Sequence, residues 1–337
     1  MGRRRLRIPS HYVHKRPAAS GRPRVNSVRA WLLGARPYSL PAAAAPVVVG
    51  VAWAWHEQGS VQLLPAVLCL LFALVMQVDA NLINDYVDFL RGTDRPDRVG
   101  PSRMFAQGLI TAPAMRRGIV LITVIGLLIG LPLIRYGGVE LIVVGLLCAA
   151  ACFLYSTYFS YRALGDVLVV LFFGLVPVYY TALCTSPPNA GRWVFPLALG
   201  LHSSLFTLHS SLPPVRPSAG ALWLGLAMGL ATDCLLLVNN HRDRRQDPLT
   251  GKRTLVVLLG ARSGMVLYAL CGLAAALIPV CIYWPTCVGM AIYLVLHLRT
   301  LRRLRSGEGT ALNPLLGATS RNMLLFALLL AASLVLL

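Results

Sequence analysis

The chain has 337 residues, 57% of them hydrophobic, and several of its apolar runs reach the roughly 20 residues that a helix needs to cross a bilayer. A soluble globular protein is therefore excluded, and an integral membrane protein is expected. The formal net charge of +19 could suit nucleic acid, but the basic residues lie between the apolar runs, as topology-setting charges do in membrane proteins. No nucleic-acid partner is expected.

Residues 1–30 are expected to form a basic cytosolic tail. Residues 1–29 are rich in Arg, Pro and Ser and contain no Asp or Glu, and no apolar stretch follows early enough for a secretory signal peptide. Such a tail would lie near anionic lipid, but an organelle transit peptide has the same composition and remains an alternative. Residues 31–337 are predicted to form one transmembrane domain.

Nine apolar segments follow, and each is predicted to be a transmembrane helix in an all-α integral membrane protein. The segments are continuous rather than alternating, which favours helices over barrel strands. They cover residues 37–56, 62–84, 117–135, 139–158, 164–184, 219–239, 264–282, 284–298 and 313–337.

The basic residues predict the orientation of these spans. With the N-terminus in the cytosol, all of the 31 Lys and Arg residues except Arg135, Arg192 and Arg216 fall on the cytosolic side. Residues 185–218 are predicted to be an external insertion, because a tenth span there would spoil this asymmetry and prolines interrupt the segment. We expect a multi-pass protein of the cell (inner) membrane.

The 12 acidic residues are unevenly distributed, and half of them lie in two short segments that each follow an apolar span on the cytosolic side. The first segment places Asn81, Asn84, Asp85 and Asp88 at intervals that share one helix face, and Asp94 follows. A carboxylate face of this kind is expected at the cytosolic end of the second span.

The second acidic segment has a similar pattern. Asn240, Asp243 and Asp247 are spaced to share one helix face, with Lys252 a few residues later. Two carboxylate faces at one depth would repel each other, and Mg²⁺, which prefers carboxylate and phosphate oxygens, would relieve this repulsion. Neighbouring Arg and Lys residues suit a polyanion, so a diphosphate is expected. The simpler alternative is two solvated helix ends.

At these residues the sequence resembles the UbiA superfamily of intramembrane prenyltransferases. The likeness covers roughly residues 31–330. The forms Gly92-Thr-Asp94 and Gly251-Lys252-Arg-Thr254 resemble the branch that prenylates 1,4-dihydroxy-2-naphthoate in menaquinone biosynthesis. The segments that carry the resemblance are Arg36–Pro41, Asn81–Asp94, Arg98–Arg103, Gln107–Ile110, Leu164–Asp166 and Asn239–Leu255.

The resemblance implies a UbiA-type bundle with an active-site cavity at the membrane edge, and a polyprenyl diphosphate donor bridged by Mg²⁺. The implied metal ligands are Asp85, Asp88, Asp243 and Asp247, with Asn84 as a further catalytic residue. The implied substrate-binding residues are Asn81, Asp94, Arg98, Arg103, Asn240, Lys252 and Tyr155. Among these, Arg98, Arg103 and Lys252 would bind the diphosphate, and the ring of Tyr155, or of Tyr86, would stabilise an allylic cation.

The acceptor implied by the branch is dihydroxynaphthoate, an aromatic acid whose carboxylate would be replaced by the prenyl group with release of CO₂. The sequence singles out no base for this reaction. Asp94 and Asp166 are both possible, and Asp166 could equally cap the helix of the fifth span. Asp79 and Asp233 lie within spans and are expected only to line the cavity. The alternatives are another UbiA branch, acting on 4-hydroxybenzoate, homogentisate or a tetrapyrrole, or a transporter, although no internal repeat is evident.

Overall fold

The computed structural model describes residues 25–93, 99–101, 103–187 and 219–337. These residues form helices and turns, without a strand among them. The helices are α1 (Val28–Ala35), α2 (Pro41–Gln58), α3 (Leu63–Leu90), α4 (Ala112–Gly130), α5 (Ile134–Gly137), α6 (Glu140–Thr157), α7 (Gly165–Val170), α8 (Val176–Thr185), α9 (Ala219–Asp243), α10 (Leu255–Ile282), α11 (Cys287–Ser306) and α12 (Asn313–Leu336). The all-α prediction is thus confirmed for the described part of the chain.

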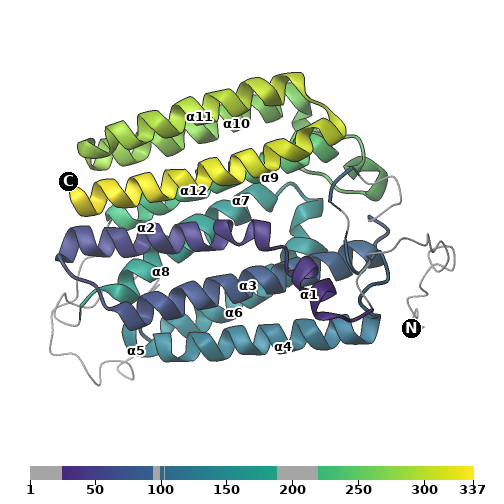
Figure 1. Ribbon diagram of the computed structural model, residues 1–337, viewed down its shortest axis with the longest axis horizontal. Coiled ribbons are helices and arrows are strands. Elements are labelled where there is room, and N and C mark those ends of the chain that lie inside the picture. Colours follow the sequence, from purple (N-terminus) through teal and green to yellow (C-terminus); the bar gives the residue numbers. More distant parts are fainter. Residues whose placement is uncertain (1–24, 94–98, 102, 188–218) are drawn as a thin grey trace.

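The long helices lie side by side along one common direction (Figure 1). Helix α9 is the most enclosed of the candidate spans and packs against α10, α12, α2, α7 and α8. Helix α3 belongs to the other side of the bundle, where it packs against α4 and α6. The C-terminal ends of α3 and α9, which carry the two acidic segments, lie at the same end of the bundle, on the right in Figure 1.

Seven described helical segments are long and apolar enough to cross a membrane, and there are eight if the bent pair α1 and α2 counts as one span. The seven are Leu63–Leu90, Ala112–Gly137, Glu140–Tyr161, Gly165–Thr185, Ala219–Asp243, Leu255–Ile282 and Gly309–Leu336. The predicted segment 284–298 forms α11, whose last two turns carry four arginines and which is not among the seven. Seven or eight of the nine predicted spans are therefore supported.

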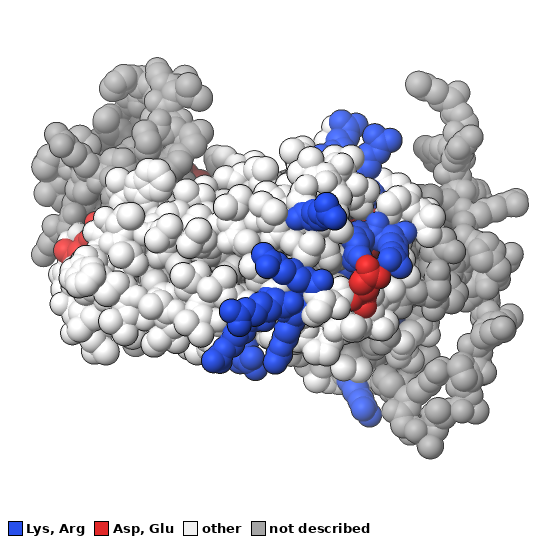
Figure 2. Space-filling view, turned by 90° about the horizontal axis from the view of Figure 1, so that it is seen from above, with Lys and Arg blue, Asp and Glu red and all other residues white. Residues whose placement is uncertain are grey.

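The outer surface of the bundle is apolar where the candidate spans face outward. Val120, Leu146 and Leu270 are each more than half exposed. Figure 2 shows one such face, with Lys and Arg gathered toward one end beside a broad uncharged region. In water such a surface would be unfavourable, whereas hydrocarbon accepts it.

The first described residues are joined to the bundle. The Ser27 side chain caps α1 by accepting a hydrogen bond from the Ala30 backbone, and Asn26 donates its backbone N–H to the Leu109 carbonyl. Residues 1–24 of the predicted tail and 188–218 of the predicted insertion lie outside the described residues. The tail and insertion predictions stay untested.

Candidate active site

A cavity of about 750 Å³ lies between the ends of α3 and α9 and extends along the bundle. Near the acidic segments its wall is polar, and farther along it is formed by apolar side chains such as Phe72, Leu133 and Phe173. The sequence-predicted site residues on its wall are Asn81, Asn84, Arg103, Tyr155, Asn240, Asp243, Asp247 and Lys252. The fold therefore brings both acidic segments to one cavity.

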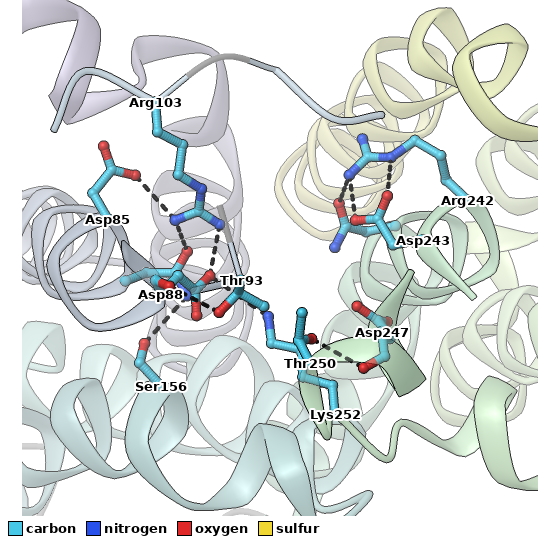
Figure 3. Close-up of polar contacts among 12 residues, drawn as sticks. Asp85, Asp88, Thr93, Arg103, Ser156, Arg242, Asp243, Asp247, Thr250 and Lys252 are labelled. Atoms are coloured by element: carbon cyan, nitrogen blue, oxygen red, sulfur yellow. Dashed lines mark hydrogen bonds and ion pairs between the residues drawn. The ribbon is translucent and has the colours of Figure 1, made fainter. Parts of the chain in front are cut away.

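The first acidic segment is helical, as predicted, because α3 continues its apolar run to Leu90. Asp85 and Asp88 are buried on one face, with 1% and 0% of their surfaces exposed. The Arg103 guanidinium donates from Nη1 to Asn84 Oδ1 (2.5 Å) and Asp85 Oδ1 (3.0 Å), and from Nη2 to Asp88 Oδ2 (2.8 Å). Figure 3 shows the guanidinium lying between the two carboxylates.

A second guanidinium reaches Asp85 from the connection between α1 and α2. Arg36 forms an ion pair with the Asp85 carboxylate and also lines the cavity. It adopts a left-handed backbone conformation (φ 53°) where α1 ends, and the following Pro37 favours such a break. Asn81 donates to the Ala35 carbonyl and to Ser39 Oγ, each at 2.9 Å. Asn81 thus holds the connection that positions Arg36.

The second acidic segment differs from the prediction. Helix α9 ends at Asp243, and Asp247 begins a separate 3₁₀ turn, Asp247–Thr250. The prediction that Asn240, Asp243 and Asp247 share one helix face is therefore wrong for Asp247. The cause is Pro248, since a residue that precedes proline is disfavoured in the α conformation. Asp247 still lines the cavity, and Lys252, which follows the turn, reaches Asp88 on α3.

Arg242 neutralises Asp243 by a two-pronged contact within the same segment. Its Nε and Nη2 lie 2.7 and 2.6 Å from the two carboxylate oxygens of Asp243. The guanidinium also donates to Asn239 Oδ1 (2.8 Å) and Asn313 Oδ1 (3.2 Å). Arg242 is therefore bound by side chains of α9 and by Asn313 at the start of α12.

Lys252 connects the two acidic segments. Its backbone N–H donates to the Asp247 carbonyl (2.9 Å), and its Nζ lies 3.5 Å from Asp88 Oδ2 (Figure 3). Burial raises the pKa of the Asp247 carboxyl to about 7, and the positive charge of Lys252 acts in the opposite direction. The carboxylates of this cavity are therefore held beside fixed positive charges.

The predicted Mg²⁺ ligands were compared with this geometry. Within the described residues, no group of three or more His, Cys, Asp or Glu side chains is close enough together to hold a metal ion. The donor chemistry nevertheless fits Mg²⁺, and the buried Asp85 Oδ2 has no hydrogen-bond partner among those residues. Asp243 and Asp247 lie on the cavity wall, whereas Asp85 and Asp88 are buried beside Arg103 and Lys252, which line it.

Other predicted site residues divide into three groups. Tyr155 and Asn240 lie on the cavity wall. Tyr86 instead packs against Phe105, with ring centroids 5.4 Å apart. Asp94 and Arg98 lie outside the described residues.

Sequence reasoning did not assign Arg36 or Asn313 to the site. Arg36 stands directly before a proline that separates two helices, and this is a signal that could have been used. Asn313 begins α12, and nothing local distinguishes it from an ordinary helix start.

The chain is similar in sequence to known prenyltransferases. The model of the UbiA prenyltransferase family matches residues 43–316. The chain is 34% identical over 314 residues to the 1,4-dihydroxy-2-naphthoate octaprenyltransferase of Mycobacterium tuberculosis, covering 90% of this chain and 96% of that protein. It is 32% identical over 245 residues to the protein of the same name from Escherichia coli, covering 70% of each.

The fold is similar to those of two solved proteins. A UbiA homologue from Aeropyrum pernix gives a TM-score of 0.59 at 15% identity, with 88% of this chain and 95% of that chain covered. A UbiA homologue from Archaeoglobus fulgidus bound to DMAPP and Mg²⁺ gives a TM-score of 0.56 at 15% identity, with 91% and 99% covered. At this identity the likeness concerns the fold.

Proposed function

Because this chain belongs to the UbiA prenyltransferase family and is a prenyl-transferring enzyme, we propose that it transfers a polyprenyl group from polyprenyl diphosphate to 1,4-dihydroxy-2-naphthoate. The observation that carries the proposal is the cavity, whose wall combines Asp243 and Asp247 with three cations and a long apolar part. The three cations, Arg36, Arg103 and Lys252, pair with the buried Asp85 and Asp88. The Mycobacterium tuberculosis relative supports the choice of acceptor by its name.

Asp85, Asp88, Asp243 and Asp247 are the residues proposed to hold Mg²⁺. When bound, Mg²⁺ would supply charge neutralisation for the diphosphate as it leaves the prenyl group. Arg103 and Lys252 already stand beside the carboxylates, so their charges are available to phosphate oxygens at the same place. Asn84, which accepts from Arg103 and donates to Ser156 Oγ (3.2 Å), keeps this cluster in position.

The apolar part of the cavity is proposed to receive the prenyl chain. Its side chains exclude water, which would otherwise capture an allylic cation. Tyr155 lies on the cavity wall, and the face of its ring is proposed to stabilise positive charge on the reacting carbon. Asn240 lies on the same wall and is proposed to orient a ligand there.

Loss of the acceptor's carboxylate completes the proposed reaction. The carbon–oxygen bond of the donor breaks, and its electron pair leaves with the diphosphate. The ring carbon that bears the carboxylate forms the new carbon–carbon bond. The bond to CO₂ then breaks and returns its electron pair to the ring, which gives demethylmenaquinol.

We propose further that the protein crosses the cell membrane nine times, with the cavity's polar end in the cytosol. The C-terminal end of α11, which carries exposed arginines, lies at the same end of the bundle as the polar ends of α3 and α9, and this supports the orientation (Figure 1). Reporter fusions after Asp97 and Lys252 should both report the cytosol. Opposite compartments at these two positions would contradict a shared site.

The function is tested with membranes that contain the protein, prenyl diphosphate, Mg²⁺ and carboxyl-labelled dihydroxynaphthoate. We expect labelled CO₂ in step with prenylated product, and neither in membranes that contain Asp88→Ala. Label retained in the product, or turnover with 4-hydroxybenzoate alone, would contradict the proposed acceptor. Such a result would leave the proposal of prenyl transfer in place, with a different acceptor or product.

A further inference from the structure

Two buried carboxylates outside the metal-binding set meet where α7 and the following π-helical turn (Leu171–Leu175) cross α9. Glycines permit the close approach. A Cβ added at Gly174 would lie 2.4 Å from the Gly225 carbonyl, and one added at Gly229 would lie 2.7 Å from the Val170 carbonyl. The two helical segments run antiparallel, so moving back four residues from Gly174 to Val170 corresponds to moving forward four residues from Gly225 to Gly229. A further step of four residues in each direction leads to Asp166 on α7 and Asp233 on α9.

This crossing brings two like charges together inside the bundle. Asp166 and Asp233 are 7% and 4% exposed, and Asp166 acts electrostatically on Asp233. In each, Oδ1 is buried without a hydrogen-bond partner among the described residues. Asp233 Oδ2 accepts only a weak, long hydrogen bond among the described residues, from Cys271 Sγ at 3.9 Å. Two ionised carboxylates are unstable in such a place, so the pair is expected to share a proton.

One member of the pair, Asp166, also faces the site described above. Asp166 lines the cavity, as do its neighbour Gly165 and Thr232, which precedes Asp233. Tyr155 lies within electrostatic reach of both carboxylates and also of Asp88 and Asp247. Asp166 therefore lies on the wall near Tyr155, where the donor's reacting carbon is proposed to lie. Asp233 lies behind Asp166 and does not line the cavity, so the expectation that it would is wrong.

From this arrangement we infer that Asp166 is a catalytic residue that accepts a proton from a hydroxyl group of the aromatic acceptor, with Asp233 as its positioning residue. The inference rests on the proposed function and deepens it. Because the two carboxyl groups share one proton, Asp233 can hold that proton while Asp166 is ionised and able to accept another. A hydroxyarene is the class of ligand that fits, because it offers an acidic O–H to an unpartnered carboxylate oxygen.

The proton transfer accompanies carbon–carbon bond formation. As the ring carbon attacks the prenyl carbon, the adjacent hydroxyl loses its proton to Asp166, and its oxygen becomes a ketone. The intermediate is a β-keto acid, which loses CO₂ readily because the electron pair of the broken bond enters the ketone system. The oxygen then regains its proton from Asp166, so atoms, protons and electrons balance over the cycle.

Asp79 provides a matched control, since it is another buried carboxylate within a candidate span. Thr123 Oγ1 donates to Asp79 Oδ2 at 2.8 Å, and Asp79 does not line the cavity, so the expectation that it would is wrong. Substitution of Asp79 by Asn should leave turnover unchanged. A loss of activity specific to Asp166→Asn would therefore reflect its place on the wall and not burial alone.

The test measures kcat and acceptor KM for the wild type, Asp166→Asn, Asp233→Asn and Asp79→Asn, together with Mg²⁺-dependent binding of prenyl diphosphate. We expect Asp166→Asn to lower kcat by about 10²-fold or more, with donor binding retained, as removal of a general base does. Asp233→Asn should lower kcat less. The same assay uses a nitro-substituted hydroxynaphthoate whose hydroxyl is already ionised, and with it the ratio of wild-type to Asp166→Asn activity should fall toward one.

Two results would overturn the inference. One is wild-type turnover by Asp166→Asn with dihydroxynaphthoate. The other is an equal loss with both acceptors, which would indicate a structural role. Failure of the proposed function is seen separately, because the wild type would then not prenylate dihydroxynaphthoate. In that case the same ratio is measured with the hydroxyaromatic acid that the wild type does use.

Discussion

The two acidic segments of the cavity are neutralised in different ways (Figure 3). The first depends on cations from distant parts of the chain, because Arg36, Arg103 and Lys252 all reach the α3 carboxylates. The second depends on its own neighbour, since Arg242 pairs with Asp243. The Asp88 side chain is 1% exposed and that of Asp243 is 16% exposed. The first segment is thus assembled by the tertiary fold, and the second by local sequence.

The largest expected effect comes from removing a carboxylate of the first segment. Asp88→Ala deletes a proposed metal ligand and leaves Arg103 and Lys252 with only part of their counter-charge. We expect turnover to be abolished while the protein still inserts into membranes. Activity is measured by product formation and insertion by the amount of protein in washed membranes. Substantial turnover in this variant would remove Asp88 from the metal site.

The contrast between the two acidic segments is tested by comparing the folding stabilities of Arg103→Met and Arg242→Met. Loss of Arg103 leaves two fully buried carboxylates without their main partner, which is expected to cost about 3–5 kcal/mol of folding free energy. Loss of Arg242 leaves only the carboxylate of Asp243, which is partly exposed, without its partner. This is expected to cost about 1–3 kcal/mol of folding free energy. Thermal unfolding in detergent measures both.

Mg²⁺ supplies a second readout for the same pair of variants. Because a metal ion would restore positive charge beside Asp85 and Asp88, Mg²⁺ should raise the Tm of Arg103→Met more than that of the wild type. The exposed Arg305→Met serves as the control and should change neither value. Equal destabilisation by Arg103→Met and Arg242→Met would argue against the contrast between the segments.

A smaller effect is expected from the residue that links the segments. Lys252→Met removes a cation 3.5 Å from Asp88 that is proposed to bind the diphosphate. The donor KM should rise by about tenfold or more, which corresponds to one charged hydrogen bond, with little change in the acceptor KM. Arg253→Met is the matched control, since its side chain is exposed and next in sequence. A donor KM that is the same in both variants would contradict the role of Lys252.

The smallest expected effect concerns Asn313 at the start of α12. Its Oδ1 accepts from Arg242 (3.2 Å), and its Nδ2 donates to the Val99 carbonyl (3.1 Å). Asn313 thus joins the second segment to the chain that leads to Arg103. Asn313→Ala should cost about 1 kcal/mol of stability and raise the donor KM a few-fold, as loss of one or two hydrogen bonds does. Asn313→Asp, which retains an acceptor for Arg242, should recover part of that loss.

Some of this arrangement could be predicted from the sequence because it depends on local pattern. The helical face of Asp85 and Asp88 follows from an apolar run that continues through them. The break before Asp247 is also local, and Pro248 would have predicted it. The apolar spans were predicted for the same reason. The predicted span 284–298 is the exception, because α11 continues through four arginines to Ser306 and is not among the candidate spans.

The remainder depends on contacts between distant segments. The Arg36 and Arg103 ion pairs with Asp85 join parts of the chain 49 and 18 residues apart, and no periodicity records them. The meeting of Asp166 and Asp233 depends on a helix crossing. The spacing of Gly225, Gly229 and Asp233 along one face of α9 indicates close packing, but the partner helix is known only from the fold.

The central claim is that both acidic segments act together on one metal-bridged diphosphate. It is tested most directly by the Kd of prenyl diphosphate for the purified protein with and without Mg²⁺, in the wild type, Asp88→Asn and Asp247→Asn. The account predicts tight binding only for the wild type with Mg²⁺, and a comparable loss in both variants. Binding that is independent of Mg²⁺, or unchanged in Asp247→Asn, would contradict it.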